Sequence, residues 1–165
     1  MLRSIGVIVL VIGLSIGSSV SAQDYNTAIG VRGGFYNGLT IKHFIGSKAA
    51  LEGIFSSRWR GFNITGLYEI NNPIAEVAGL NWYYGVGGHI GFWNGRYVHW
   101  KDDYNDHTVI GADGILGLEY NFSEIPINLS IDWKPAINLV GYNGFWGDGG
   151  AFSIRYILGR RVASE

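Results

Sequence analysis

The stretch of residues 126–135, PINLSIDWKP, places a polar or charged side chain at every second position of an otherwise apolar run. One set of alternate residues is Ile127, Leu129, Ile131 and Trp133, and the other is Asn128, Ser130, Asp132 and Lys134. A period of two is that of a β-strand, whose successive side chains point to opposite faces of the sheet. The stretch therefore predicts a strand with one apolar and one polar face.

The same alternation recurs along the chain and predicts eight strands, separated by clusters of Gly, Asn, Asp and Pro. They span residues 25–34, 39–45, 50–59, 62–70, 80–93, 108–122, 127–140 and 151–158. Connections after the second and sixth strands are short, whereas those after the fifth and seventh are long, polar and aromatic. This pattern predicts an all-β fold, an eight-stranded antiparallel up-and-down transmembrane β-barrel. Residues 71–79 form a further long connection, which we expect to be either one helical turn or an ordered loop.

The phase of each predicted strand separates its side chains into an apolar face and a charged face. Period two alone does not say which face points outward, because a soluble lipocalin-like barrel has the same alternation with its apolar face inward. Glycines on the charged face suit the narrow interior of an eight-stranded barrel, and aromatic residues near both strand ends suit membrane interfaces. These features favour a charged lumen, in which buried charges must pair. The predicted lumenal ion-pair network consists of Arg32, Lys42, Glu52, Arg58, Glu69, Asp113, Glu119, Asp132, Lys134 and Arg155.

The N-terminus has the features of a Sec signal peptide. A basic Arg3 precedes an apolar run over residues 5–16, and small residues follow up to Ala22. We expect cleavage near Ala22, with residues 1–22 as the signal peptide and residues 23–165 as the barrel domain. Charged residues make up only 15% of the chain, and 12 basic against 13 acidic residues leave no basic surface for nucleic acid. The chain has no cysteine, so its fold does not rely on disulfides.

Four segments cover most of the mature chain: LTIKHFIGSKAALEGI, GLYEINNPI, GADGILGLEYNFSEIPINLSIDWKPAINL and GGAFSIRYILG. Together they resemble the small eight-stranded outer-membrane β-barrel proteins of Bacteroidetes-type bacteria, which share the architecture of OmpA-type and OmpX-type barrels. The resemblance implies export, insertion by the barrel-assembly machinery, and residence in the outer membrane in contact with lipid and lipopolysaccharide. The family's last strand usually ends in an aromatic residue, whereas here it ends in Leu158 and GRRVASE follows. Most members resembling this chain have no assigned activity, so the resemblance implies a location and not a reaction.

The sequence carries no pattern typical of catalysis. A lipid A deacylase would use a His-x-Ser pair beside a carboxylate, and no histidine here has serine two positions later. The longest connection holds two histidines and three aspartates that could bind a divalent cation, but their spacing matches no metal motif and favours a solvated loop. This loop cluster consists of His99, Asp102, Asp103, Asp106 and His107.

We therefore expect no catalytic residue, cofactor or resident metal. The expected function is that of a non-enzymatic outer-membrane barrel whose external loops serve envelope structure or surface contact, with a surface partner that the sequence does not identify. Two alternatives are an outer-membrane lipid-modifying enzyme and a soluble lipocalin-like periplasmic barrel that binds an apolar ligand.

Overall fold

The computed structural model describes residues 25–58, 61–93, 107–141, 144–147 and 149–160. All regular secondary structure in these segments is β-strand, as the alternation predicts. A search of the same segments finds no helix with the length and apolar character needed to cross a bilayer. The predicted signal peptide, residues 1–22, lies outside the described residues.

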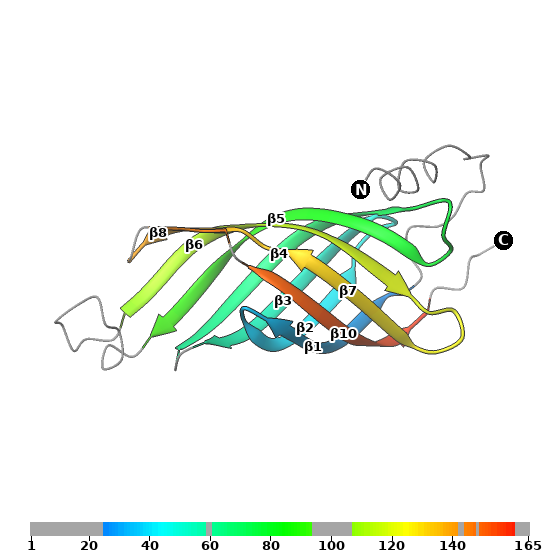
Figure 1. The fold of residues 1–165 in the computed structure, drawn as a ribbon, viewed down its shortest axis with the longest axis horizontal. Helices are drawn as coiled ribbons and strands as arrows, with labels where there is room; N and C mark the ends of the chain where they lie inside the picture. Colours follow the sequence, from blue (N-terminus) through cyan, green and yellow to red (C-terminus); the bar gives the residue numbers. More distant parts are fainter. Residues whose placement is uncertain (1–24, 59–60, 94–106, 142–143, 148, 161–165) are drawn as a thin grey trace, which may run out of the picture.

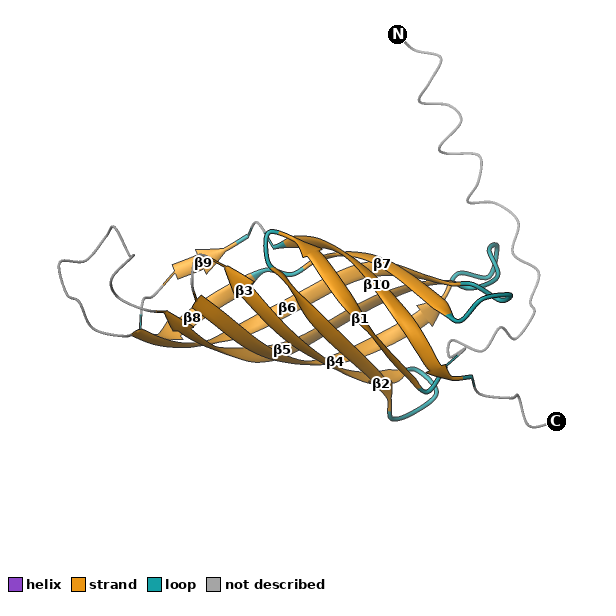
Figure 2. Ribbon diagram, turned by 90° about the horizontal axis from the view of Figure 1, so that it is seen from below, coloured by secondary structure: helices purple, strands orange, loops and turns teal. Residues whose placement is uncertain are grey.

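The strands form a closed antiparallel barrel, seen from two directions in Figures 1 and 2. They are β1 (Thr27–Gly34), β2 (Asn37–Phe44), β3 (Ala49–Arg58), β4 (Gly61–Pro73), β5 (Leu80–Trp93), β6 (His107–Asn121), β7 (Ile127–Trp133), β8 (Ala136–Val140), β9 (Gly144–Trp146) and β10 (Gly150–Gly159). Strands β1 to β7 pair in chain order, and β10 pairs with both β7 and β1, which closes the ring. The predicted eight-stranded up-and-down barrel is confirmed, with β7 and β8 as two parts of one barrel strand.

The seventh barrel strand is divided because of Pro135. Proline has no N–H to donate to a ladder, and here its carbonyl instead accepts a hydrogen bond from Gly114 N at 2.9 Å. Beyond it, β8 continues along β6 but pairs on its other side with β9. The predicted strand over residues 127–140 is therefore interrupted at Pro135, and the connection after it contains the short strand β9, which was not predicted. Figure 1 shows β6 and β8 reaching farther along the barrel axis than β1 and β2.

The two ends of the barrel differ in their connections. We call one end of the barrel the terminal end. It holds the first and last residues of the described barrel strands and the turns 45–48, 74–79 and 122–126. At the opposite end, the loop end, β5 stops at Trp93 and β6 begins at His107. Of the two forms expected for residues 71–79, the ordered loop is observed: β4 continues to Pro73, and Ile74 N then donates to Leu80 O at 2.9 Å.

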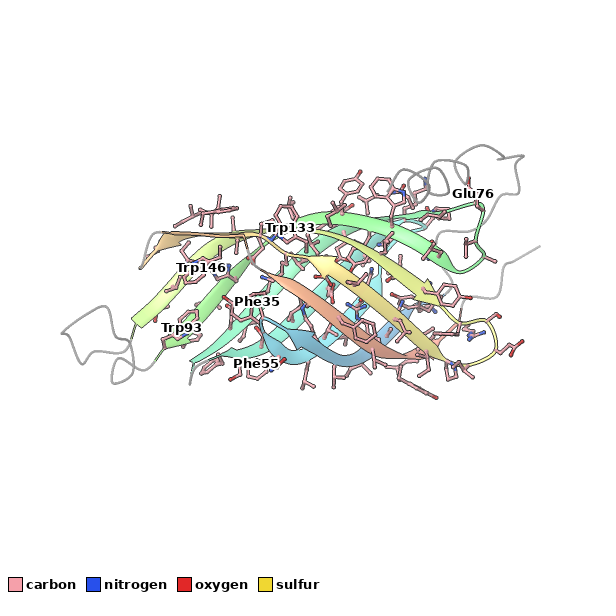
Figure 3. The ribbon with its side chains drawn as sticks, in the orientation of Figure 1. Phe35, Phe55, Glu76, Trp93, Trp133 and Trp146 are labelled. Carbon is pink, nitrogen blue, oxygen red and sulfur yellow. The ribbon has the colours of Figure 1, made fainter. Side chains whose placement is uncertain are left out.

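Alternate side chains along the barrel strands point outward and form what we call the apolar belt. Its large exposed members are Ile29, Val31, Leu39, Ile41, Leu51, Phe55, Phe62, Ile64, Tyr68, Trp82, Tyr84, Val86, Ile110, Leu116, Leu118, Ile131, Trp133, Phe152, Ile154, Tyr156 and Leu158. Among the described strand side chains, no Asp, Glu, Lys or Arg faces outward. Figure 3 shows side chains both projecting from the barrel on all sides and filling its interior.

Candidate functional site

The lumen is the candidate functional site, because the buried charged side chains converge there. The residues of the predicted network whose side chains are described all face the lumen and are at most 7% exposed: Arg32, Lys42, Glu52, Glu69, Asp113, Glu119, Asp132, Lys134 and Arg155. The backbone of Arg58 lies at the end of β3, but its side chain is outside the described part of the structure. The described network therefore contains four cations and five anions, which meet in three groups.

The first group is a bidentate pair between Arg32 of β1 and Asp132 of β7. Arg32 Nη1 donates to Asp132 Oδ2 at 2.7 Å, and Nη2 donates to Oδ1. The Tyr83 hydroxyl adds a third hydrogen bond to the same carboxylate at 3.1 Å. Strand β10 lies between β1 and β7, so the pair links two strands that are not neighbours. Gly117 makes room for it, because a Cβ there would lie 2.6 Å from the Tyr83 ring and 2.7 Å from Asp132 Cβ.

The second group lies nearer the terminal end and is centred on Lys42 of β2. Its ammonium group lies 2.9 Å from Glu69 Oε2 and 3.0 Å from Glu119 Oε2. It also donates to Asn71 Oδ1 at 2.8 Å and lies 4.1 Å from the centroid of the Tyr83 ring. Two carboxylates, an amide and an aromatic face thus surround one fully buried cation, which compensates for its lost hydration.

Arg155 of β10 belongs to the same group and is also fully buried. Its Nη2 donates to Glu52 Oε1, and Nη1 donates to Asn128 Oδ1 at 3.0 Å and to Ser130 Oγ at 2.8 Å. Its Nε donates to Thr40 Oγ1 at 3.2 Å. The planar guanidinium thereby joins strands on both sides of β10, as an arginine with several fixed donors is suited to do.

The third group lies toward the loop end. Asp113 accepts a hydrogen bond from Lys134 Nζ at 2.5 Å and contacts His89 Nδ1 at 2.6 Å. The other ring nitrogen of His89 lies 3.0 Å from Asn138 Oδ1. Both nitrogens of the imidazole therefore have protein partners in the lumen.

Apolar side chains occupy further parts of the lumen, in two clusters. One cluster, near the terminal end, consists of Tyr25, Ala28, Phe44, Ala50 and Ile157; a second consists of Ile54, Leu67, Tyr83 and Ile115. A barrel of eight strands has an interior just wide enough for side chains to fill it. The two clusters and the ion pairs together make this lumen a packed core.

Sequence reasoning missed several neutral partners in the lumen. Tyr25 and Asn128 donate to Glu119 Oε2 at 3.2 and 3.3 Å, and the Thr40 hydroxyl donates to Glu52. The signal was present, because Thr40 and Asn128 share the strand phase of the charged residues. Their partners lie on other strands, however, and a single strand's alternation does not reveal contacts across the barrel.

The predicted loop cluster falls almost wholly outside the described residues. His99, Asp102, Asp103 and Asp106 belong to residues 94–106, and only the backbone of His107 is described, at the start of β6. Among the described residues, no group of three or more His, Asp or Glu side chains is arranged to hold a metal ion.

Comparison with known proteins does not assign the chain to a family. No family model matches the chain, and no curated protein matches it either.

Proposed function

We propose that this chain is an integral outer-membrane protein without enzymatic activity, whose packed barrel anchors external loops that serve envelope structure or surface contact. The observation that carries the proposal is the distribution of side chains. Charged groups of the described strands lie in the lumen, while the apolar belt surrounds the outside. A monomeric soluble protein rarely exposes a contiguous apolar patch larger than roughly 300–600 Å². A barrel whose outer surface contacts lipid requires such a belt.

Aromatic residues at both edges of the belt support the same proposal. Near the loop end, Phe62 packs between Phe55 and Phe92, with ring centroids 5.9 and 5.1 Å apart. Near the terminal end, Trp82 and Tyr84 stack at 5.4 Å. Aromatic girdles of this kind occupy the two interfaces of outer-membrane barrels.

The spacing of these girdles fits a bilayer. Trp82 and Phe92 lie on the same strand, about ten residues apart, which corresponds to roughly 33 Å along the strand. A tilt of about 40° reduces this to about 25 Å along the barrel axis, which is the height of the apolar band in outer-membrane barrels. The belt is therefore tall enough to match the membrane that we propose surrounds it.

The proposal that the protein has no enzymatic activity rests on the contacts and burial of the lumenal side chains. His89 in the lumen has both nitrogens engaged, and the described lumenal acidic groups are buried among ion pairs and apolar side chains. A catalyst needs a group that reaches its substrate. We propose that membrane lipid, lipopolysaccharide and the barrel-assembly machinery are the partners of the barrel, and that the external loops carry any contact beyond the envelope.

Location is tested by fractionating cells that express the full chain and comparing the gel mobility of unboiled and boiled samples. We expect the protein in the outer-membrane fraction, with a mobility that changes on boiling because the folded barrel resists detergent. A protein that stays in solution without detergent would contradict the proposal and favour the soluble barrel. Lipid A profiles of cells with and without the gene are expected to be identical, and a changed profile would favour the lipid-modifying enzyme.

A sharper test uses the absence of cysteine, since a single introduced thiol is then the only one in the protein. Val86 lies in the apolar belt and is 67% exposed, whereas Lys48 lies in an exposed turn at the terminal end. In lipid vesicles accessible from both sides, a water-soluble maleimide should label K48C and spare V86C. Equal labelling of the two variants in vesicles would mean that the belt faces water.

A further inference from the structure

Three glutamates share one buried group with only two cations. Glu52, Glu69 and Glu119 are each at most 2% exposed, as are Lys42 and Arg155, which contact them. We call these five residues the glutamate cluster. The other described lumenal charges are satisfied elsewhere: Arg32 pairs with Asp132, and Asp113 pairs with Lys134 and His89.

The charge count of the glutamate cluster does not balance if every member is ionised. Three carboxylates against two cations leave one negative charge uncompensated in a packed interior. Burying such a charge is so unfavourable that the group takes up a proton and becomes neutral. Charge balance therefore requires a proton on one carboxyl group of the cluster.

Hydrogen bonding identifies which carboxyl group it is. Glu52 accepts from Arg155 and from the Thr40 hydroxyl. Glu119 accepts from Lys42 at 3.0 Å, and also from the Tyr25 hydroxyl and the Asn128 amide. Glu69, by contrast, has only the contact of its Oε2 with the Lys42 ammonium at 2.9 Å, and neither of its oxygens accepts a well-directed hydrogen bond. Glu69 is thus the carboxyl group least stabilised as an anion.

A partner for the proton is available on the neighbouring strand. Glu52 of β3 and Glu69 of β4 are diagonal neighbours on the lumenal face, since Glu52 pairs with Leu67 and Glu69 pairs with Ala50. Long side chains at diagonal positions of two paired strands lie within reach of each other. Glu52 Oε2 is buried and has no other donor. One proton between the two groups would give a partner both to this oxygen and to an oxygen of Glu69.

We propose that the barrel binds one proton at the Glu52–Glu69 carboxyl pair, with Glu69 as the carboxylic acid that donates to Glu52 Oε2. Among the described residues, the titratable and charged groups that surround the pair are Lys42 of β2, Tyr83 of β5, Glu119 of β6, Arg155 of β10, Tyr25 ahead of β1, and Arg32 of β1, which is itself paired with Asp132. With the proton bound, two cations meet two carboxylates and the cluster is electrically neutral. The proton site lies in the interior and is the same whether lipid or water surrounds the barrel.

Infrared spectroscopy of the folded full-length protein at neutral pH tests the proposal, because a protonated carboxyl group has a C=O stretching band that an ionised one lacks. We expect the wild-type protein to show this band, shifted in D₂O, and E69Q to lose it. E119Q should lose the band as well, although it leaves Glu69 in place, because two cations would then face two carboxylates and Glu69 would ionise. E76Q, which alters an exposed turn, should keep it.

The unfolding midpoint in urea separates the proton carrier from its neighbours. E69Q replaces a neutral acid by a neutral amide of the same shape and should retain the wild-type midpoint. E119Q weakens the oxygen that accepts from Lys42, Tyr25 and Asn128, and it forces Glu69 to ionise where no well-directed donor reaches it, so it should lower the midpoint. The proposal is overturned if the wild-type protein has no band, as it would if a bound sodium ion balanced the charge. It is also overturned if the band survives in E69Q, or if E69Q lowers the midpoint as far as E119Q does.

Discussion

The bidentate pair between Arg32 and Asp132 provides a direct test of whether the lumen is dry. The Arg32 and Asp132 side chains are 2% and 0% exposed, respectively. Removing one partner of a buried ion pair leaves the other charge unpaired and costs about 3–5 kcal/mol. In a water-filled channel the same pair would contribute only about 0–1 kcal/mol, because water screens and solvates both groups. We therefore expect R32M and D132N each to lower the free energy of unfolding by about 3–5 kcal/mol.

A double-mutant cycle measures the interaction itself. The double variant R32M/D132N carries neither charge, so its loss should be smaller than the sum of the single losses, with a coupling free energy of at least about 2 kcal/mol. Urea unfolding of the refolded barrel, followed by tryptophan fluorescence in lipid vesicles, supplies the four free energies. As a control, K48M removes an exposed turn charge and should change stability by less than about 0.5 kcal/mol.

Single losses below about 1 kcal/mol, with a coupling that falls as salt is raised, would indicate an interior open to water and ions. A packed lumen predicts instead a coupling that is insensitive to salt, because mobile ions have no access to the pair.

Three further variants test other parts of the structure. A Cβ at lumen-facing Gly30 would overlap the carbonyl oxygen of Ile154 on β10, so G30A should sharply reduce the yield of folded barrel. The control variant G66A adds its Cβ in open space and should fold normally. Equal yields of the two variants would contradict this prediction. Leu67→Ala should lower the free energy of unfolding by about 2–5 kcal/mol through a cavity in the lumenal core, and a loss under about 1 kcal/mol would mean that the site is loosely packed. Arg160→Ala removes hydrogen bonds to three carbonyls of the turn after β6. Because water can reach these carbonyls, the variant should lower the free energy of unfolding in urea by only about 1–2 kcal/mol. A loss above about 3 kcal/mol would show that the turn is essential to barrel closure.

The strand alternation predicts the fold because the side-chain period of a strand is two, so the facing of a residue follows from its neighbours in sequence. The stretch over residues 126–135 shows this: Ile131 and Trp133 are exposed, and Asp132 and Lys134 are buried. The same stretch shows the limit, since Pro135 ends β7 and the chain then forms β8 and β9. Strand β9 lies in a glycine-rich segment without alternation, so nothing local predicts it.

The contacts of the lumen were not predictable for a different reason. A strand's alternation places Arg32 and Asp132 on the same face of the sheet but says nothing of which charges meet across it. That depends on the register of each strand pair and on the curvature of the closed ring. Neutral partners such as Asn71 and Tyr25 are no more distinctive in sequence than any other polar residue. The charge imbalance of the glutamate cluster emerges only when the contacts are known.

Closure of the ring through β1 and β10 also bears on how the protein is made. The β1 ladder with β10 joins Ile29 to Tyr156 and Val31 to Ile154, so the first and last of the described strands are direct neighbours. Until β10 has been synthesised, β1 and β7 both present an unpaired edge, and the ion pairs that depend on Arg155 cannot form. The ring therefore completes only once β10 is available, and a nascent chain must be kept from aggregating until then. Once closed, the barrel has no first strand: because Thr27 lies opposite Gly159, a circularly permuted gene with the old ends joined there would encode the same set of strand pairs.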